Sequence, residues 1–81
     1  MVEAMTSAVH ICRGVNRRYV VLTKPAGHRK WRTISKDFKS LKTAAAKLAN
    51  YIAGAKRGER GIVCFTADYY DPVVVLRIDR P

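Results

Sequence analysis

The segment LKTAAAKLANYIAGAK, residues 41–56, constrains the fold most, because its apolar residues repeat at the spacing of an α-helix. The repeat runs at intervals of four, three and four positions, through Leu41, Ala45, Leu48 and Ile52. Ser40 stands where a helix N-cap is expected, and Gly54 or Gly58 is suited to end the helix. The sequence therefore predicts a helix of roughly 13 to 16 residues whose apolar stripe packs on a core.

Short apolar strings on both sides of this segment alternate as β-strands do. Three strings precede it and two follow it, at residues 8–13, 18–23, 30–35, 61–67 and 73–78. Turn residues separate them at 14–16, in KPAG and in DYYDP. The first three strings predict a three-stranded antiparallel meander. Because 81 residues have room for one core, we expect a single α+β domain over residues 1–81. In it, one helix covers one face of an antiparallel sheet, in the order β-β-β-α-β-β.

The distribution of charge indicates a polyanionic partner. The chain carries a formal charge of +10, and residues 4–36 contain no Asp or Glu. A balance this basic exceeds what solubility requires and is typical of proteins that bind nucleic acid. We expect contacts from the two hairpins and, secondarily, from the helix. The candidates are Arg13, Arg17, Arg18, Lys24, His28, Arg29, Lys30, Trp31, Arg32, Lys36, Lys42 and Lys47. If about six of them neutralised phosphates of duplex DNA, log K would fall against log salt with a slope near −5.

The orientation of Trp31, the only tryptophan, is left open by the strand pattern. If Ile34 points into the helix-covered core, Trp31 faces solvent and is available to stack on bases. If Trp31 points inward, Lys30 and Arg32 lie on the open face. The two registers predict either an aromatic contact surface or a row of cations.

The section RRYVVLTKPAGHRKWRTISKDFKSLKTAAAKLANYI resembles DNA-binding modules built of three strands and a helix. These are the ethylene-response-factor type of plants and the arm-binding domains of phage and transposon tyrosine recombinases. The resemblance is carried by an arginine-bearing strand, a tryptophan-bearing strand, and Phe38 ahead of an alanine-rich helix. It implies that the sheet enters the major groove, with contacts from Arg17, Arg18, Arg29, Lys30, Trp31 and Arg32. It covers under half the chain, and those families lack the two strands that follow here.

Metal and catalytic sites are not predicted. His10, Cys12, His28 and Cys64 would supply two cysteines and two histidines, but they lack the close pairs on tight loops that structural zinc sites use. The acids around Tyr69 and Tyr70 are turn residues, and no nucleophile has a recognisable setting. We therefore expect a non-enzymatic protein that needs no cofactor.

The absence of a signal-peptide pattern and of a long apolar run favours a cytoplasmic protein, as do two cysteines without paired spacing. The favoured function is binding to nucleic acid, with duplex DNA ahead of RNA. The alternative is a phage or mobile-element inhibitor that binds an acidic surface of a host protein, such as a nucleic-acid enzyme or an immune complex. If the apolar strand at 73–78 lies at an edge of the sheet, it is suited to strand addition by a second copy, which would give a homodimer, or by another protein.

Overall fold

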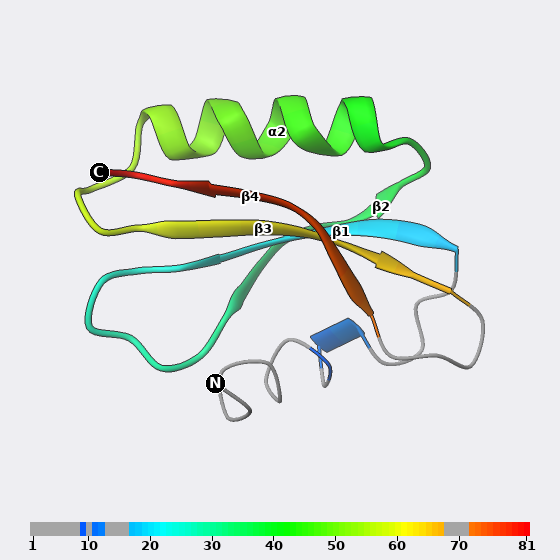
Figure 1. Cartoon of the computed structure of the whole chain (residues 1–81), viewed down its shortest axis with the longest axis horizontal. Coiled ribbons are helices and arrows are strands. Elements are labelled where there is room, and N and C mark those ends of the chain that lie inside the picture. Colours follow the sequence, from blue (N-terminus) through cyan, green and yellow to red (C-terminus); the bar gives the residue numbers. More distant parts are fainter. Residues whose placement is uncertain (1–8, 10, 13–16, 68–71) are drawn as a thin grey trace.

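The computed structural model describes residues 9, 11, 12, 17–67 and 72–81 of the chain. Four strands and one long helix follow one another in the order β-β-α-β-β (Figure 1). They are β1 (Arg18–Lys24), β2 (Arg32–Phe38), α2 (Leu41–Ala53), β3 (Arg60–Thr66) and β4 (Val73–Asp79).

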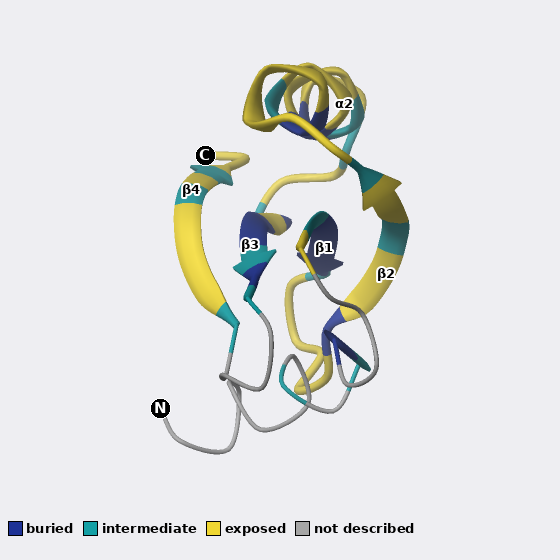
Figure 2. Cartoon of the chain, turned by 90° about the vertical axis from the view of Figure 1, so that its right-hand side faces the viewer, coloured by how far each residue is buried: buried dark blue, intermediate teal, exposed yellow. Residues whose placement is uncertain are grey.

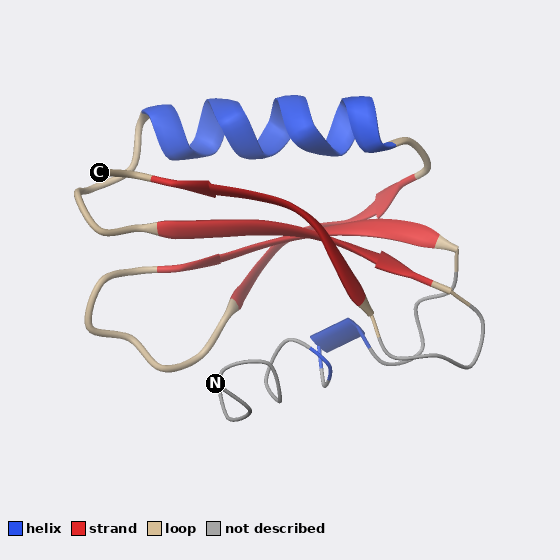
Figure 3. Ribbon diagram, viewed as in Figure 1, coloured by secondary structure: helices blue, strands red, loops and turns tan. Residues whose placement is uncertain are grey.

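The strands form one antiparallel sheet in the order β2-β1-β3-β4, and α2 lies across one face of it (Figure 3). Since β1 is antiparallel to both β2 and β3, the strands β2 and β3 are parallel to each other, with β1 between them. Helix α2 is therefore the crossover of a split β-α-β unit. The expected α+β class, with one helix on an antiparallel sheet, is confirmed.

The predicted first strand is wrong. Residues 9, 11 and 12 are helical, and the turn expected at residues 14–16 lies outside the described residues. The meander required this segment to pair with β1, but β2 and β3 occupy both edges of β1. Periodicity cannot distinguish a strand from a helical turn in so short a string. The observed order is consequently one strand shorter than predicted.

Helix α2 begins at the predicted N-cap, where Ser40 Oγ accepts a hydrogen bond of 3.2 Å from the Thr43 amide. It ends at Gly54, and its buried stripe consists of Ala44, Leu48 and Ile52. The predicted stripe was partly wrong, because Leu41 is 39% exposed and Ala45 only half-buried. A stripe at intervals of four puts the small Ala44 against the sheet, which lets the helix approach closely.

The two central strands, β1 and β3, are largely buried (Figure 2), and most of their buried side chains are apolar on both faces of the sheet. On the helix side, the buried core consists of Val21, Ala44, Leu48, Ile52 and Val63, with Ile34 and Phe38 of β2 packed against it. On the opposite side, it consists of Cys12, Val20, Leu22, Trp31, Ile62 and Cys64. Adjacent residues of β1 thus contribute to different cores, as strand geometry requires.

These two cores settle the orientation of Trp31. Ile34 packs on the helix side while Trp31 lies in the opposite core and is only 9% exposed. The two orientations of Trp31 that the strand pattern allows both assume that only one face of the sheet is buried. A second buried face allows Ile34 and Trp31 to be covered at the same time. The ring is therefore not presented as a stacking surface.

Candidate nucleic-acid interface

Three separate parts of the chain meet at one end of the sheet. The register aligns Lys24 of β1 with Arg60 of β3, and Arg60 with Asp79 of β4. The β1–β2 connection, the α2–β3 connection and the end of the chain therefore lie together. We call this the hairpin end, defined as residues 24–32, 54–60 and 77–81.

Backbone hydrogen bonds hold the α2–β3 connection to the end of the chain. The Gly58 amide donates to the Arg80 carbonyl at 3.0 Å, and the Arg80 amide donates to the Glu59 carbonyl at 2.8 Å. On the other side, Arg32 Nη2 lies 3.5 Å from the Glu59 Oε2 atom. Backbone hydrogen bonds thus hold the end of the chain to the α2–β3 connection, and the ion pair of Arg32 with Glu59 links that connection to the start of β2.

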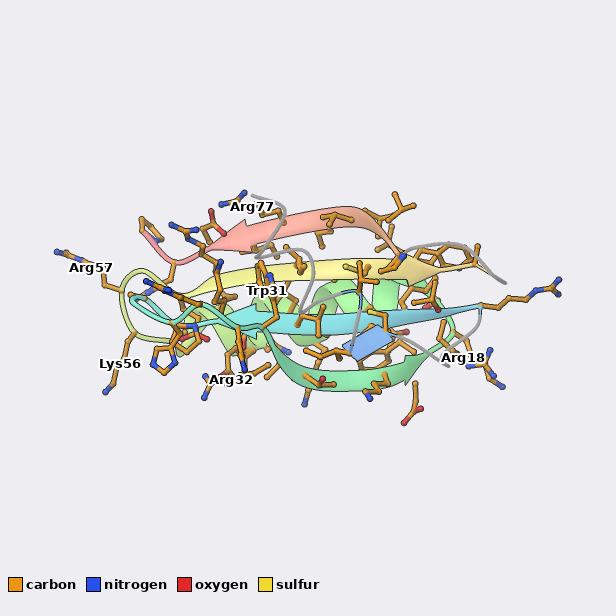
Figure 4. The ribbon with its side chains drawn as sticks, turned by 90° about the horizontal axis from the view of Figure 1, so that it is seen from below. Arg18, Trp31, Arg32, Lys56, Arg57 and Arg77 are labelled. Carbon is orange, nitrogen blue, oxygen red and sulfur yellow. The ribbon has the colours of Figure 1, made fainter. Side chains whose placement is uncertain are left out.

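The hairpin end is strongly basic. Its two acids are each paired with an arginine, Glu59 with Arg32 and Asp79 with Arg77. Its nine basic residues are Lys24, Arg29, Lys30, Arg32, Lys56, Arg57, Arg60, Arg77 and Arg80. Figure 4 shows Arg32, Lys56 and Arg57 projecting at this end of the molecule. Nine cations against two carboxylates place most of the net charge of +10 here.

A cavity of about 340 Å³ opens at the hairpin end. Small residues form part of its wall, and Lys24, Arg60 and Arg80 bring positive charge to it. The lining residues are Lys24, Pro25, Ala26, Gly27, His28, Gly58, Arg60, Asp79 and Arg80.

Lys24 is the most buried of these cations. It is only 8% exposed, and its Nζ atom lies 4.9 Å from the centroid of the Trp31 ring. A cation at this distance from an indole face is stabilised by the ring quadrupole. Trp31 therefore contributes to the site by supporting Lys24 from beneath the surface.

The other predicted contact residues do not join this surface. Arg18 is the first residue of β1, and Arg17 directly precedes it. The other end of this seven-residue strand is about 20 Å away. Figure 4 shows Arg18 at the end of the molecule opposite to Lys56 and Arg57. Lys36 is exposed on edge strand β2, and Lys42 and Lys47 are exposed on α2. Arg13 lies outside the described residues. The predicted grip by two hairpins is not formed, because the described residues of the first predicted strand, 9, 11 and 12, are helical.

Sequence reasoning missed five basic residues of the hairpin end, namely Lys56, Arg57, Arg60, Arg77 and Arg80. The sequence does indicate that RGERG, residues 57–61, is a basic connector. What was missing was the pairing of β3 with both β1 and β4, which brings this connector beside KPAGHRK.

The two cysteines are neighbours in the core opposite the helix. Both thiols are free and buried, and they are hydrogen-bonded to each other. That hydrogen bond lowers the pKa of Cys12 against the opposing effect of burial, with a smaller contribution from Lys36. The same hydrogen bond, together with burial, raises the pKa of Cys64 strongly. Among the described residues, no three His, Cys, Asp or Glu side chains are grouped as metal ligands would be.

No family model, no curated protein and no solved structure matches this chain. In the part of the chain that the structure describes, no helix has the length and apolar character to cross a membrane. The assignment of function therefore rests on the charge and geometry of the hairpin end.

Proposed function

We propose that this protein binds nucleic acid, duplex DNA in the first place, through the basic hairpin end and without catalysis. One observation carries the proposal. Segments that are distant in sequence converge to place nine Lys and Arg side chains around two carboxylates that are already paired. Surfaces of this kind attract the phosphate backbone and release its condensed counterions.

The dimensions of the domain are compatible with this mode. Its two shorter extents are 28 and 15 Å, which bound the size of the hairpin end. Duplex DNA carries one negative charge per about 1.7 Å of axis, so 28 Å of duplex presents roughly 16 charges. Because Trp31 is buried, the contacts are to phosphates, and we expect affinity to depend weakly on base sequence.

The test is a fluorescence-anisotropy titration of a random-sequence duplex at several salt concentrations. We expect micromolar or tighter binding at low salt, which weakens steeply as salt rises. The double variant Lys56→Ala with Arg57→Ala should reduce the salt slope by about two, because each phosphate contact contributes about one. The matched control, Lys42→Ala with Lys47→Ala, removes the same charge from the exposed face of α2. It should change the salt slope less.

Absence of duplex binding at low salt would refute this proposal. Affinity purification with and without nuclease then tests the alternative. Recovery of one dominant host protein that resists nuclease would support binding to an acidic protein surface. Competition by single-stranded or duplex RNA in the anisotropy assay separates a preference for RNA from one for DNA.

A further inference from the structure

Lys24 is the unusual residue of the hairpin-end cavity, because only 8% of its surface is exposed. Lysine is among the residues least often found buried without a charge partner. In the described part of the chain, the ion pairs link Arg32 to Glu59 and Arg77 to Asp79, and no carboxylate pairs with Lys24. The Trp31 ring offsets only part of the loss of hydration. An anion in the cavity would supply the missing countercharge.

The other charges of the cavity favour the same kind of ligand. Arg60 and Arg80 line it together with Lys24, and the one acid in the lining is Asp79. The Asp79 carboxylate accepts from Arg77 Nε at 3.2 and 3.1 Å through its two oxygens. Its charge is therefore largely neutralised by a residue outside the lining, and the cavity stays cationic.

The walls leave room for a compact ligand. Pro25, Ala26, Gly27 and Gly58 carry little or no side chain, so that a ligand can approach the backbone. The volume of about 340 Å³ is at the lower end of the range of about 300 to 1,000 Å³ for small-molecule pockets. A phosphate group with part of an attached sugar is of this scale.

We propose that the hairpin-end cavity binds a phosphate monoester, presented by the 5′ end of a nucleic-acid strand or by a mononucleotide. A monoester carries about −1.5 to −2 charge at pH 7, which matches three cations better than the single charge of a backbone diester does. A monoester also continues into a chain on one side only. A recess at the tip of the domain accommodates such an end, whereas an internal diester must leave in two directions. This proposal rests on the proposed function where the strand end is concerned.

The experiment compares one duplex with 5′-phosphate ends and the same duplex with 5′-hydroxyl ends. Adenosine monophosphate and inorganic phosphate serve as small probes, read by the fluorescence of Trp31, the only tryptophan. We expect at least about tenfold tighter binding of the phosphorylated duplex, equivalent to about 1.4 kcal/mol. Addition of adenosine monophosphate should alter Trp31 emission, because Lys24 lies over that ring.

Two variants assign the effect to the cavity. Lys24→Met retains the length of the side chain over Trp31 and removes the charge, so that the preference for the 5′-phosphate should be lost without a lower melting temperature. Arg80→Gln should reduce the preference independently, because the bonds of Arg80 to Gly58 and Glu59 are made by its backbone. Lys47→Met, on the exposed face of α2, is the matched control and should keep the preference.

The outcomes separate this proposal from the broader one. Equal binding of both duplexes by the native protein would overturn the monoester site and leave the proposed function intact. Retention of the preference in both Lys24→Met and Arg80→Gln would also overturn it. Binding of adenosine monophosphate without binding of either duplex would support the cavity as a monoester site and overturn the nucleic-acid proposal.

Discussion

Gly58 lies directly against Ala26, at the point where the α2–β3 connection meets the β1–β2 connection. A Cβ atom on Gly58 would be 2.7 Å from the Cβ atom of Ala26, closer than two such atoms approach in proteins. The backbone of Gly58 also has a φ of +87°, in the region that favours glycine. This one residue therefore sets how closely the two loops of the hairpin end approach.

We expect Gly58→Ala to destabilise the fold by about 2 kcal/mol or more, from backbone strain and from the contact with Ala26. Gly27→Ala is the matched control. Gly27 has a similar φ of +79°, but a Cβ atom there would meet no atom within 4 Å. Gly27→Ala should therefore lower the free energy of unfolding by only about 1 to 2 kcal/mol. Urea denaturation of both variants measures the difference, and equal losses would show that the contact with Ala26 does not matter.

Gly61→Ala tests the packing of α2 on the sheet. A Cβ atom on Gly61 would collide with Leu48 and lie 3.1 Å from Ile52 Cδ1 and 3.0 Å from the Ile78 carbonyl oxygen. Because the interface is filled, we expect a loss of about 1 to 3 kcal/mol in the free energy of unfolding. Gly54→Ala, whose Cβ atom would meet only the Tyr51 carbonyl oxygen at 3.9 Å, should change it by less than about 1 kcal/mol. A Gly61→Ala protein as stable as the native one would contradict the close approach of helix and sheet.

Local patterns in the sequence predicted the helix and four of the strands, with ends that differ by at most three residues. They predicted these elements because a capped helical stripe and alternating strands are short-range signals. They failed at residues 8–13, where the outcome depends on which strands occupy the edges of β1. Long-range pairing of this kind is not encoded in periodicity.

The candidate site, too, could be predicted from the sequence only in part. The cations around Trp31 were visible in the sequence, but their convergence with Lys56 and Arg57 depends on the position of β3 beside β1. The role of Trp31 as the support of Lys24 follows from a second buried face. An alternation pattern that assumes one core cannot predict it.

The cysteine pair predicts how stability depends on pH. Above the ordinary thiol pKa of about 8.5, the unfolded chain releases two thiol protons, whereas the folded pair releases one because the pKa of Cys64 is strongly raised. The unfolded state then binds fewer protons, so the free energy of unfolding falls as pH rises, by up to about 1.4 kcal/mol per pH unit. Below 8.5 the lowered pKa of Cys12 acts in the opposite sense, so the contribution of the pair to stability is greatest near pH 8.5.

Urea denaturation between pH 7.5 and about 10, with a reductant present, measures this dependence. The double variant Cys12→Ala with Cys64→Ala removes both thiols, and its stability should fall less steeply above pH 8.5. Parallel curves for the native protein and the double variant would contradict the raised pKa of Cys64.

The two edges of the sheet differ in how well each would accept a strand of a second copy. Strand β2 carries Arg32, Lys36 and Asp37, which discourage pairing between edges, whereas the first half of β4 is uncharged. Its valines are 60, 39 and 41% exposed at positions 73, 74 and 75. If β4 pairs with β4 of a second copy, Val75→Lys should shift the protein towards monomer, because it puts a charge into the new strand pair. Sedimentation velocity over a range of concentrations measures the shift. Thr33→Lys, which puts the same charge on the exposed edge strand β2, is the control and should not shift the protein towards monomer. A native protein that stays monomeric at high concentration would refute pairing through β4.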